Sequence, residues 1–137
     1  MRFIPLIVSP APKTQHQRAV MRLGVLLFTS CPDDLELLPP FDVALAPDTV
    51  IQPDLIIART ADLTDHDLPT APLLAIEVLS PSTRGSIFCS RTSDSRVPAC
   101  PHYWTVDPDT PAITARTLVD GQYDGRRSRR RPTVPGH

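Results

Sequence analysis

The sequence predicts a single domain of the α/β class, and three observations support this prediction. The chain has 137 residues, which fits one domain and is long enough to bury a real core. Residues 15–28 repeat apolar side chains at helical spacing, and several short apolar segments between proline-rich turns are typical of strands. With no internal repeat or linker, we expect one domain over residues 1–123 and a basic, disordered tail over residues 124–137.

The N-terminal segment predicts a strand followed by a helix. Residues 3–8 are apolar and end at a Ser-Pro step, which favours a short strand. Thr14 and Gln17 have the spacing of a capping box, so we expect a helix over about residues 15–28. One side of this helix is apolar and is expected to pack on the core. It carries Ala19, Val20, Leu23, Leu26 and Leu27.

The middle of the chain contains a series of expected strands. Residues 35–40 and 41–47 flank a Pro-Pro turn, and residues 50–57 predict a buried strand with a Pro-Asp step in its middle. Residues 60–70 are polar and predict a loop or a short helix. Residues 73–79 are the most apolar segment, which is typical of a strand in the centre of a sheet.

The last two expected strands are residues 102–106 and 112–118, joined by a turn with two prolines. Between the central strand and residue 102, a compact α/β domain needs a helix. Residues 85–100 are instead a mixture of serine, arginine and cysteine without periodicity. This stretch therefore requires a separate explanation.

Charge and cysteine content narrow the class of protein. The formal net charge is −1, but five of the 14 basic residues lie between Arg126 and Arg131, so a basic end follows an acidic body. Such an end can bind nucleic acid or can be a solvated tail. Three cysteines at irregular spacing favour reduced thiols and a cytoplasmic protein, and no apolar run is long enough for a membrane span. The oligomeric state stays open, with a homodimer as one alternative.

Two carboxylates are hard to explain by packing. Glu77 interrupts the most apolar strand, and Asp54 lies in the other apolar strand directly after Pro53. Carboxylates are almost never buried unpaired. Glu77 could pair with an arginine such as Arg59 or Arg84, and a Pro-Asp step can simply mark a turn. Together, two acids on neighbouring strand ends are natural ligands for a divalent cation such as Mg²⁺.

Three motifs carry a resemblance to a known family. They are Pro53-Asp54, the block AIEVLSPSTR at residues 75–84, and HYWTVDP at residues 102–108; residues 8–17 also fit. Over about residues 6–123 the chain resembles the Uma family of restriction-endonuclease-like proteins, in the PD-(D/E)xK nuclease superfamily. The resemblance implies a mixed β-sheet flanked by helices.

The resemblance also implies a chemistry. Asp54 and Glu77 are its expected catalytic residues and metal ligands, with the backbone carbonyl of Val78 as a third ligand and Mg²⁺, or another divalent cation, as cofactor. The expected substrate is DNA, cleaved at its phosphodiester bonds. His16 and Arg84 are candidate nucleic-acid contacts, although a histidine on a helix is commonly a core or surface residue. Tyr103 and Trp104 could stack on bases, but core packing explains them better.

The family pattern has a catalytic lysine in an Asp-Leu-x-Leu-Lys block on the helix after the central strand, and this chain lacks it. The segment has the expected length. Suitable codons for residues 87–91, read from one base earlier, encode Asp-Leu-Leu-Leu-Lys. We interpret residues 86–100 as a frameshifted stretch; a divergent loop is the alternative. The family's opening helix and its later strands are also missing, so a truncated copy is expected.

Two functions follow from the sequence. The first is a Mg²⁺-dependent endodeoxyribonuclease, impaired because Arg91 stands where the lysine is expected, and a guanidinium stays protonated. The second is a non-catalytic relic or interaction module that keeps the nuclease fold. A cleavage assay with Mg²⁺ separates them.

Overall fold

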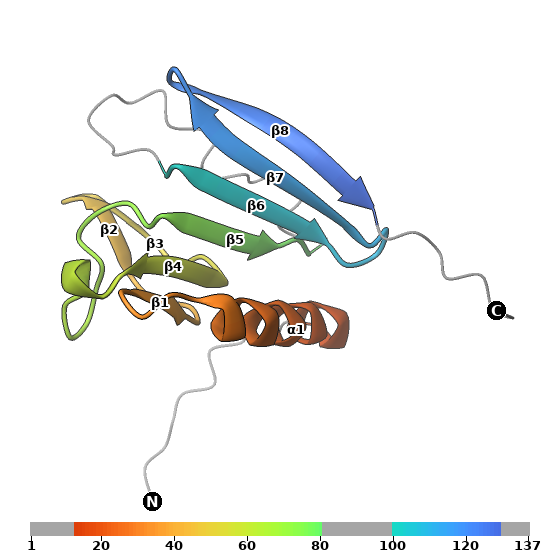
Figure 1. The fold of residues 1–137 in the computed structure, drawn as a ribbon, viewed down its shortest axis with the longest axis horizontal. Coiled ribbons are helices and arrows are strands. Elements are labelled where there is room, and N and C mark those ends of the chain that lie inside the picture. Colours follow the sequence, from red (N-terminus) through yellow and green to blue (C-terminus); the bar gives the residue numbers. More distant parts are fainter. Residues whose placement is uncertain (1–12, 81–99, 130–137) are drawn as a thin grey trace, which may run out of the picture.

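A computed structural model describes residues 13–80 and 100–129 (Figure 1). One α-helix, a single 3₁₀ turn and eight strands are present in these two ranges. In chain order they are α1 (Thr14–Ser30), β1 (Leu35–Leu38), β2 (Val43–Ala46), β3 (Thr49–Ile51), β4 (Leu55–Arg59), η1 (Thr60–Asp62), β5 (Leu74–Val78), β6 (His102–Asp107), β7 (Ala112–Val119) and β8 (Gln122–Arg129). The strands expected at residues 3–8 and the stretch 86–99 lie outside the described residues.

Six strands form one mixed sheet in the order β1-β4-β5-β6-β7-β8. The pair β5–β6 is parallel and the other four pairs are antiparallel. β2 and β3 form a separate two-stranded sheet. The adjacency of β4 and β5, inside the large sheet, confirms the expected neighbourhood of the two apolar strands.

The single strand expected over residues 50–57 is wrong. The structure divides this segment into β3, which pairs with β2, and β4, which pairs with β1 and β5. Pro53 lies in the gap and is fully buried. Because proline has no N–H to donate to a β-ladder, the chain changes sheets at this point.

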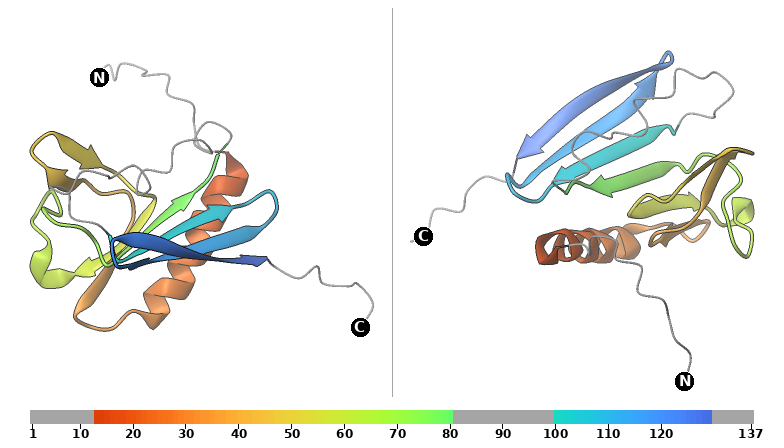
Figure 2. Two further views of the ribbon diagram at one scale, coloured as in Figure 1. Left: turned by 90° about the horizontal axis from the view of Figure 1, so that it is seen from above. Right: turned by 180° about the vertical axis from the view of Figure 1, so that it is seen from behind.

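The helix packs on one face of the large sheet, beside β4 and β5 and away from β8 (Figures 1 and 2). Val20, Leu23 and Leu27 contact a buried cluster of strand residues, as expected, while Leu26 at the edge of the apolar side is 65% exposed. The buried strand residues of this cluster are Leu55, Leu74, Ile76, Val78 and Val106. They are apolar because α1 shields this face from water.

The expected capping box is absent. Thr14 is already the first helical residue, and Lys13 stands at the N-cap without a side-chain hydrogen bond. The Gln17 side chain lies instead against His16. The backbone N–H of Gln17 donates to the Lys13 carbonyl at 3.1 Å, so the first turn closes through the backbone alone.

The opposite face of the sheet has its own small core. Ala75, Cys100 and Tyr103 are buried together there, and Tyr103 is fully inaccessible to solvent. Trp104, one residue further along β6, packs into the cluster beneath α1. Core packing is therefore confirmed for both aromatic residues, on opposite faces of the same strand.

The expected tail begins too early. Residues 124–129 belong to β8, which pairs with β7 along its whole length. A two-residue loop joins the strands, with φ of 51° at Asp120 and 80° at Gly121. This geometry matches the twist of a tight hairpin, and Asp-Gly is a favoured sequence for it. Residues 130–137 lie outside the described part.

Two smaller expectations concern cysteines and membranes. Neither Cys31 nor Cys100 forms a disulfide bond, and Cys89 is outside the described residues. None of the helical segments within residues 13–80 and 100–129 is long and apolar enough to cross a bilayer.

Candidate metal centre

The register of β4 and β5 brings the two expected carboxylates together. These strands are antiparallel, with Leu55 opposite Ile76. Continued by one residue, the same register places Asp54 opposite Glu77, at the edge where β4 begins and β5 ends. Directly opposite residues of an antiparallel pair lie on one face, with Cβ atoms about 4.5–5.5 Å apart. The register therefore indicates that the two carboxylates lie close together.

Asp54 is held by two hydrogen bonds to the same oxygen. Its Oδ2 accepts the backbone N–H of Val78 at 2.8 Å and lies 3.2 Å from Nε2 of His16. The first bond ties the start of β4 to the end of β5. The second ties both strands to the first turn of α1. Asp54 is thus fixed in orientation by three elements while 25% of its side chain stays exposed.

His16 lies beside the carboxylate. Its Nδ1 faces Oε1 of Gln17 at 3.0 Å, and its side chain is 13% exposed. The structure therefore gives this histidine a partner within the protein, which sequence reasoning did not find. A contact of His16 with nucleic acid stays a prediction. Arg84, the other candidate contact, lies outside the described residues.

Glu77 has a drier environment than Asp54. Its Oε2 accepts a hydrogen bond from the Tyr103 hydroxyl at 3.0 Å. Burial raises the pKa of Glu77, the Tyr103 hydrogen bond partly opposes this, and the negative charge of Asp54 raises it further. The effect of Asp54 on this pKa agrees with the closeness that the strand register indicates.

The alternative of a structural ion pair does not apply to Glu77 in the described part of the chain. Arg59 is at the other end of β4 and is exposed. The ion pair found in residues 13–80 and 100–129 joins His16 to Asp54. A pairing with Arg84 is outside what the structure describes.

The donor atoms fit a magnesium ion. The hydrogen bonds described above use Oδ2 of Asp54 and Oε2 of Glu77, and in the described ranges none reaches Oδ1 or Oε1. Mg²⁺ is typically bound by one or two carboxylates and keeps several water molecules. The described residues contain no group of three His, Cys, Asp or Glu side chains suited to a metal. Within the described ranges, further ligands would therefore be water or backbone, such as the Val78 carbonyl.

Tyr103 is a site residue that sequence reasoning assigned only to the core. It lies opposite Ala75 in the parallel ladder, diagonal to Glu77. Arg116 stacks over its ring at 5.7 Å and donates from Nη1 to Oγ1 of Thr105 at 2.9 Å. Only the register of β5, β6 and β7 reveals this chain of contacts.

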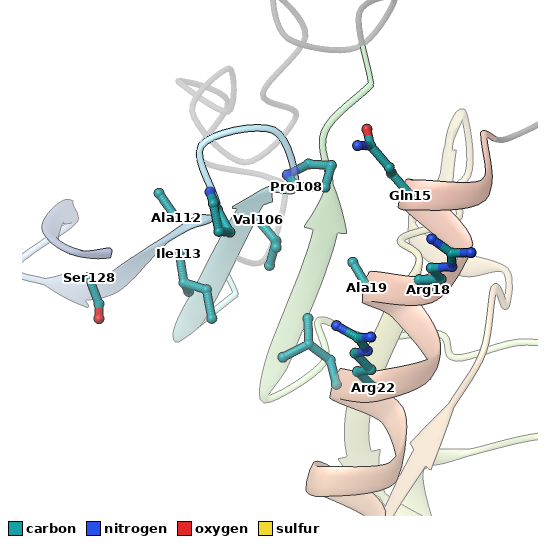
Figure 3. Close-up of a pocket in the computed structure, with 11 residues that line it drawn as sticks. Gln15, Arg18, Ala19, Arg22, Val106, Pro108, Ala112, Ile113 and Ser128 are labelled. Carbon is teal, nitrogen blue, oxygen red and sulfur yellow. The ribbon is translucent and has the colours of Figure 1, made fainter. Parts of the chain in front are cut away.

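Three hollows lie near α1, and neither carboxylate lines any of them. One of about 350 Å³ lies between α1 and Leu37, Pro39 and Leu55. The other two differ in size and lining. The larger, about 510 Å³, is on the helix side of the sheet, and Figure 3 shows Arg18 and Arg22 reaching over its mainly apolar wall. The smaller, about 40 Å³, adjoins the site. It is lined by Lys13, Gln15, His16, Leu79, Ser80, Pro108 and Asp109. The smaller hollow is the one next to the candidate site, because His16, which contacts Asp54, lines it.

Comparisons with known proteins show the family and the fold of the chain. The model of the Uma2 family, described as "Putative restriction endonuclease", matches residues 5–135. A crystal structure from Anabaena variabilis, titled "a putative nuclease belonging to DUF820", is similar in fold with a TM-score of 0.69. The sequence identity is 14%, and the match covers 93% of this chain and 75% of the other. No curated protein matches the chain.

Proposed function

Since this chain belongs to the Uma2 family of restriction-endonuclease-like proteins, we propose that it is built to hydrolyse DNA phosphodiester bonds with Mg²⁺. The family and the structural neighbour support a nuclease-like function. The observation that carries the finer proposal is the placement of Asp54 and Glu77 opposite each other at one edge of the sheet.

Asp54 and Glu77 would hold the cation, with the Val78 carbonyl and water completing its ligands. Bound there, the ion would lower the pKa of a water molecule and stabilise charge on the phosphate. The Val78 N–H and His16 keep Asp54 in one orientation, and Tyr103 does the same for Glu77. Ligands held by such partners bind metal more tightly than free ones.

The lysine that is expected to position the attacking water is missing from its expected place in this sequence. The only lysine in the chain is Lys13, at the N-cap of α1 beside the small hollow that His16 also lines. The expected lysine position falls on Arg91, outside the described residues. We therefore propose that this copy cleaves DNA feebly. The same missing lysine favours the second candidate function, a relic that binds metal without catalysis.

A cleavage assay with a matched pair of variants tests the proposal. The chain has two glutamates, so Glu77→Gln can be compared with Glu36→Gln in β1. Supercoiled plasmid is incubated with each protein in Mg²⁺ or EDTA. Any cleavage is expected to require Mg²⁺, to disappear in Glu77→Gln and to persist in Glu36→Gln.

Metal binding is measured separately by the shift of the melting temperature with Mg²⁺. A shift that Glu77→Gln abolishes, without cleavage by the unchanged chain, favours the non-catalytic function. Cleavage that survives Glu77→Gln contradicts both the site and the mechanism.

A further inference from the structure

We propose that Arg116 and Arg127 form a track for the phosphate backbone of duplex DNA, leading along one face of the sheet to Asp54 and Glu77. The identity of the ligand rests on the proposed function. The track itself rests on the strand register, on exposure and on charge.

The register places these residues in one row. Glu77 is opposite Thr105, Thr105 is opposite Thr114, and Thr114 is opposite Arg127. Residues opposite each other in successive strands point to the same face. The row therefore runs from the acidic edge of the site, across β6 and β7, to a cation on β8. Its β6 member Thr105 is only 4% exposed and accepts a hydrogen bond from Arg116, so the accessible positive groups of this face are Arg116 and Arg127.

The distances suit a duplex. Neighbouring strands are about 4.8 Å apart, so three steps from Glu77 to Arg127 span about 14 Å. At about 3.4 Å per base pair, this is roughly four base pairs of helix axis. A phosphate bound at Arg127 would thus belong to the flank of the cleaved site, where contacts set position rather than sequence.

Arg127 has the properties of a phosphate contact. It is exposed, and the one ion pair within residues 13–80 and 100–129 joins other residues. The neighbouring position on its face of β8 is Gly125, where an added Cβ would lie 3.6 Å from Cγ of Arg116, so the stem of Arg116 lies beside this position. Arg127 thus presents an exposed guanidinium next to the stem of a second arginine, and two neighbouring positive charges attract a phosphate backbone.

Arg116 holds a second positive charge between Arg127 and the site. Its stacking on Tyr103 and its bond to Thr105 fix the guanidinium above β6, one strand from Glu77. A fixed cation loses little conformational entropy on binding a phosphate. Through Tyr103, the same residue also braces the hydrogen bond to Glu77.

Because side chains alternate between the two faces along β8, the neighbouring Arg126 is a control for Arg127. Arg126 has the same charge and is also exposed, but it lies opposite Ala115 and faces the α1 side of the sheet. The arginine run that looked like a basic tail is thereby divided between two faces. Glu77 lies on the Arg127 face.

The test compares Arg127→Ala with Arg126→Ala. Binding of a fluorescent 20-base-pair DNA duplex is measured in EDTA between 50 and 200 mM salt, so that cleavage plays no part. Loss of one phosphate contact is expected to reduce the slope of log K against log salt by about one, and to weaken binding about tenfold near 0.1 M salt. Arg126→Ala is expected to bind like the unchanged chain, and Arg127→Lys to retain most of the affinity.

Equal losses in Arg126→Ala and Arg127→Ala would overturn the track, because attraction would then depend on net charge alone. Failure of the unchanged chain to bind the duplex at 50 mM salt would overturn it as well. Neither result bears on Glu77-dependent cleavage, which the plasmid assay reports independently. Melting temperatures of all variants establish that each is folded.

Discussion

The two faces of the six-stranded sheet differ in the polarity of their side chains, although the same strands form both. On β5, Ile76 points into the apolar cluster beneath α1, and the next residue, Glu77, points to the face that carries Tyr103. The buried strand residues of the α1 face are all apolar, whereas the other face has a smaller core around Tyr103. The other face holds a row that passes from carboxylates through threonines to an arginine.

This difference indicates that neighbouring residues of one strand have different roles: Ile76 stabilises the fold, and Glu77 belongs to the candidate metal site. Substitutions on the α1 face are expected to change the free energy of unfolding. Substitutions of the polar and charged residues on the opposite face, outside its small core of Ala75, Cys100 and Tyr103, are expected to change metal or DNA binding while the fold persists. Each prediction below tests that difference.

The largest expected change concerns the missing base. Replacing residues 86–100 by the neighbouring-frame sequence, with its Asp-Leu-Leu-Leu-Lys, is expected to raise Mg²⁺-dependent cleavage by about 10²–10⁴. The reason is that a lysine would then be available to position water at the carboxylates. Plasmid cleavage rates measure the effect, with Glu77→Gln in the repaired chain as control. An unchanged cleavage rate would show that the missing lysine is not what limits cleavage by this chain.

A substitution beneath α1 tests whether the buried residues of that face stabilise the fold. Ile76→Ala is expected to lower the free energy of unfolding by about 2–5 kcal/mol, because Ile76 is fully buried and its removal leaves a cavity. Urea unfolding measures this. Glu77→Gln, one residue away, is the matched variant and is expected to fold normally. Comparable destabilisation by both would contradict the separation of the faces.

Tyr103→Phe tests a residue that both packs in the core and donates a hydrogen bond to Glu77. The ring stays in the core, but the hydrogen bond to Glu77 is lost. Removing a partner of a metal ligand typically lowers metal affinity or activity about 10–100-fold. Mg²⁺ titration by melting-temperature shift measures the loss. Unchanged affinity would mean that Tyr103 serves packing alone.

Local patterns predicted the α1 face well. The apolar spacing of Val20, Leu23 and Leu27 indicated which side of the helix is buried, and the apolar run ending at Leu79 indicated an interior strand. Such patterns succeed because burial repeats with the period of the element itself. They also singled out Asp54 and Glu77, because a charge inside an apolar run is costly.

The polar face could not be predicted in the same way, because its contacts depend on strand register. Tyr103 is 26 positions from Glu77 in the chain, and His16 is 38 from Asp54. The split at Pro53 was missed because apolar residues continue on both sides of it. β8 was missed because its arginines suggested solvation, although Asp120-Gly121 was a usable hairpin signal.

The smallest expected effect is a pH dependence that arises from Glu77. Burial raises its pKa in the folded protein above the unfolded value of about 4.3. The folded state therefore binds this proton more tightly than the unfolded state. The corresponding stability is fully present below the unfolded pKa and is lost as pH rises through the folded pKa.

In EDTA, the free energy of unfolding of the unchanged chain is therefore expected to fall relative to Glu77→Gln as pH rises from about 4, and to level off above the folded pKa. Urea unfolding of both proteins at a series of pH values measures the difference. Mg²⁺ is expected to reduce it, because a cation between Asp54 and Glu77 offsets the burial and the mutual repulsion that raise the pKa of Glu77. Parallel stability curves in EDTA would mean that Glu77 is as well solvated as an exposed carboxylate. Burial would then affect the stability contributed by Ile76 but not the pKa of Glu77.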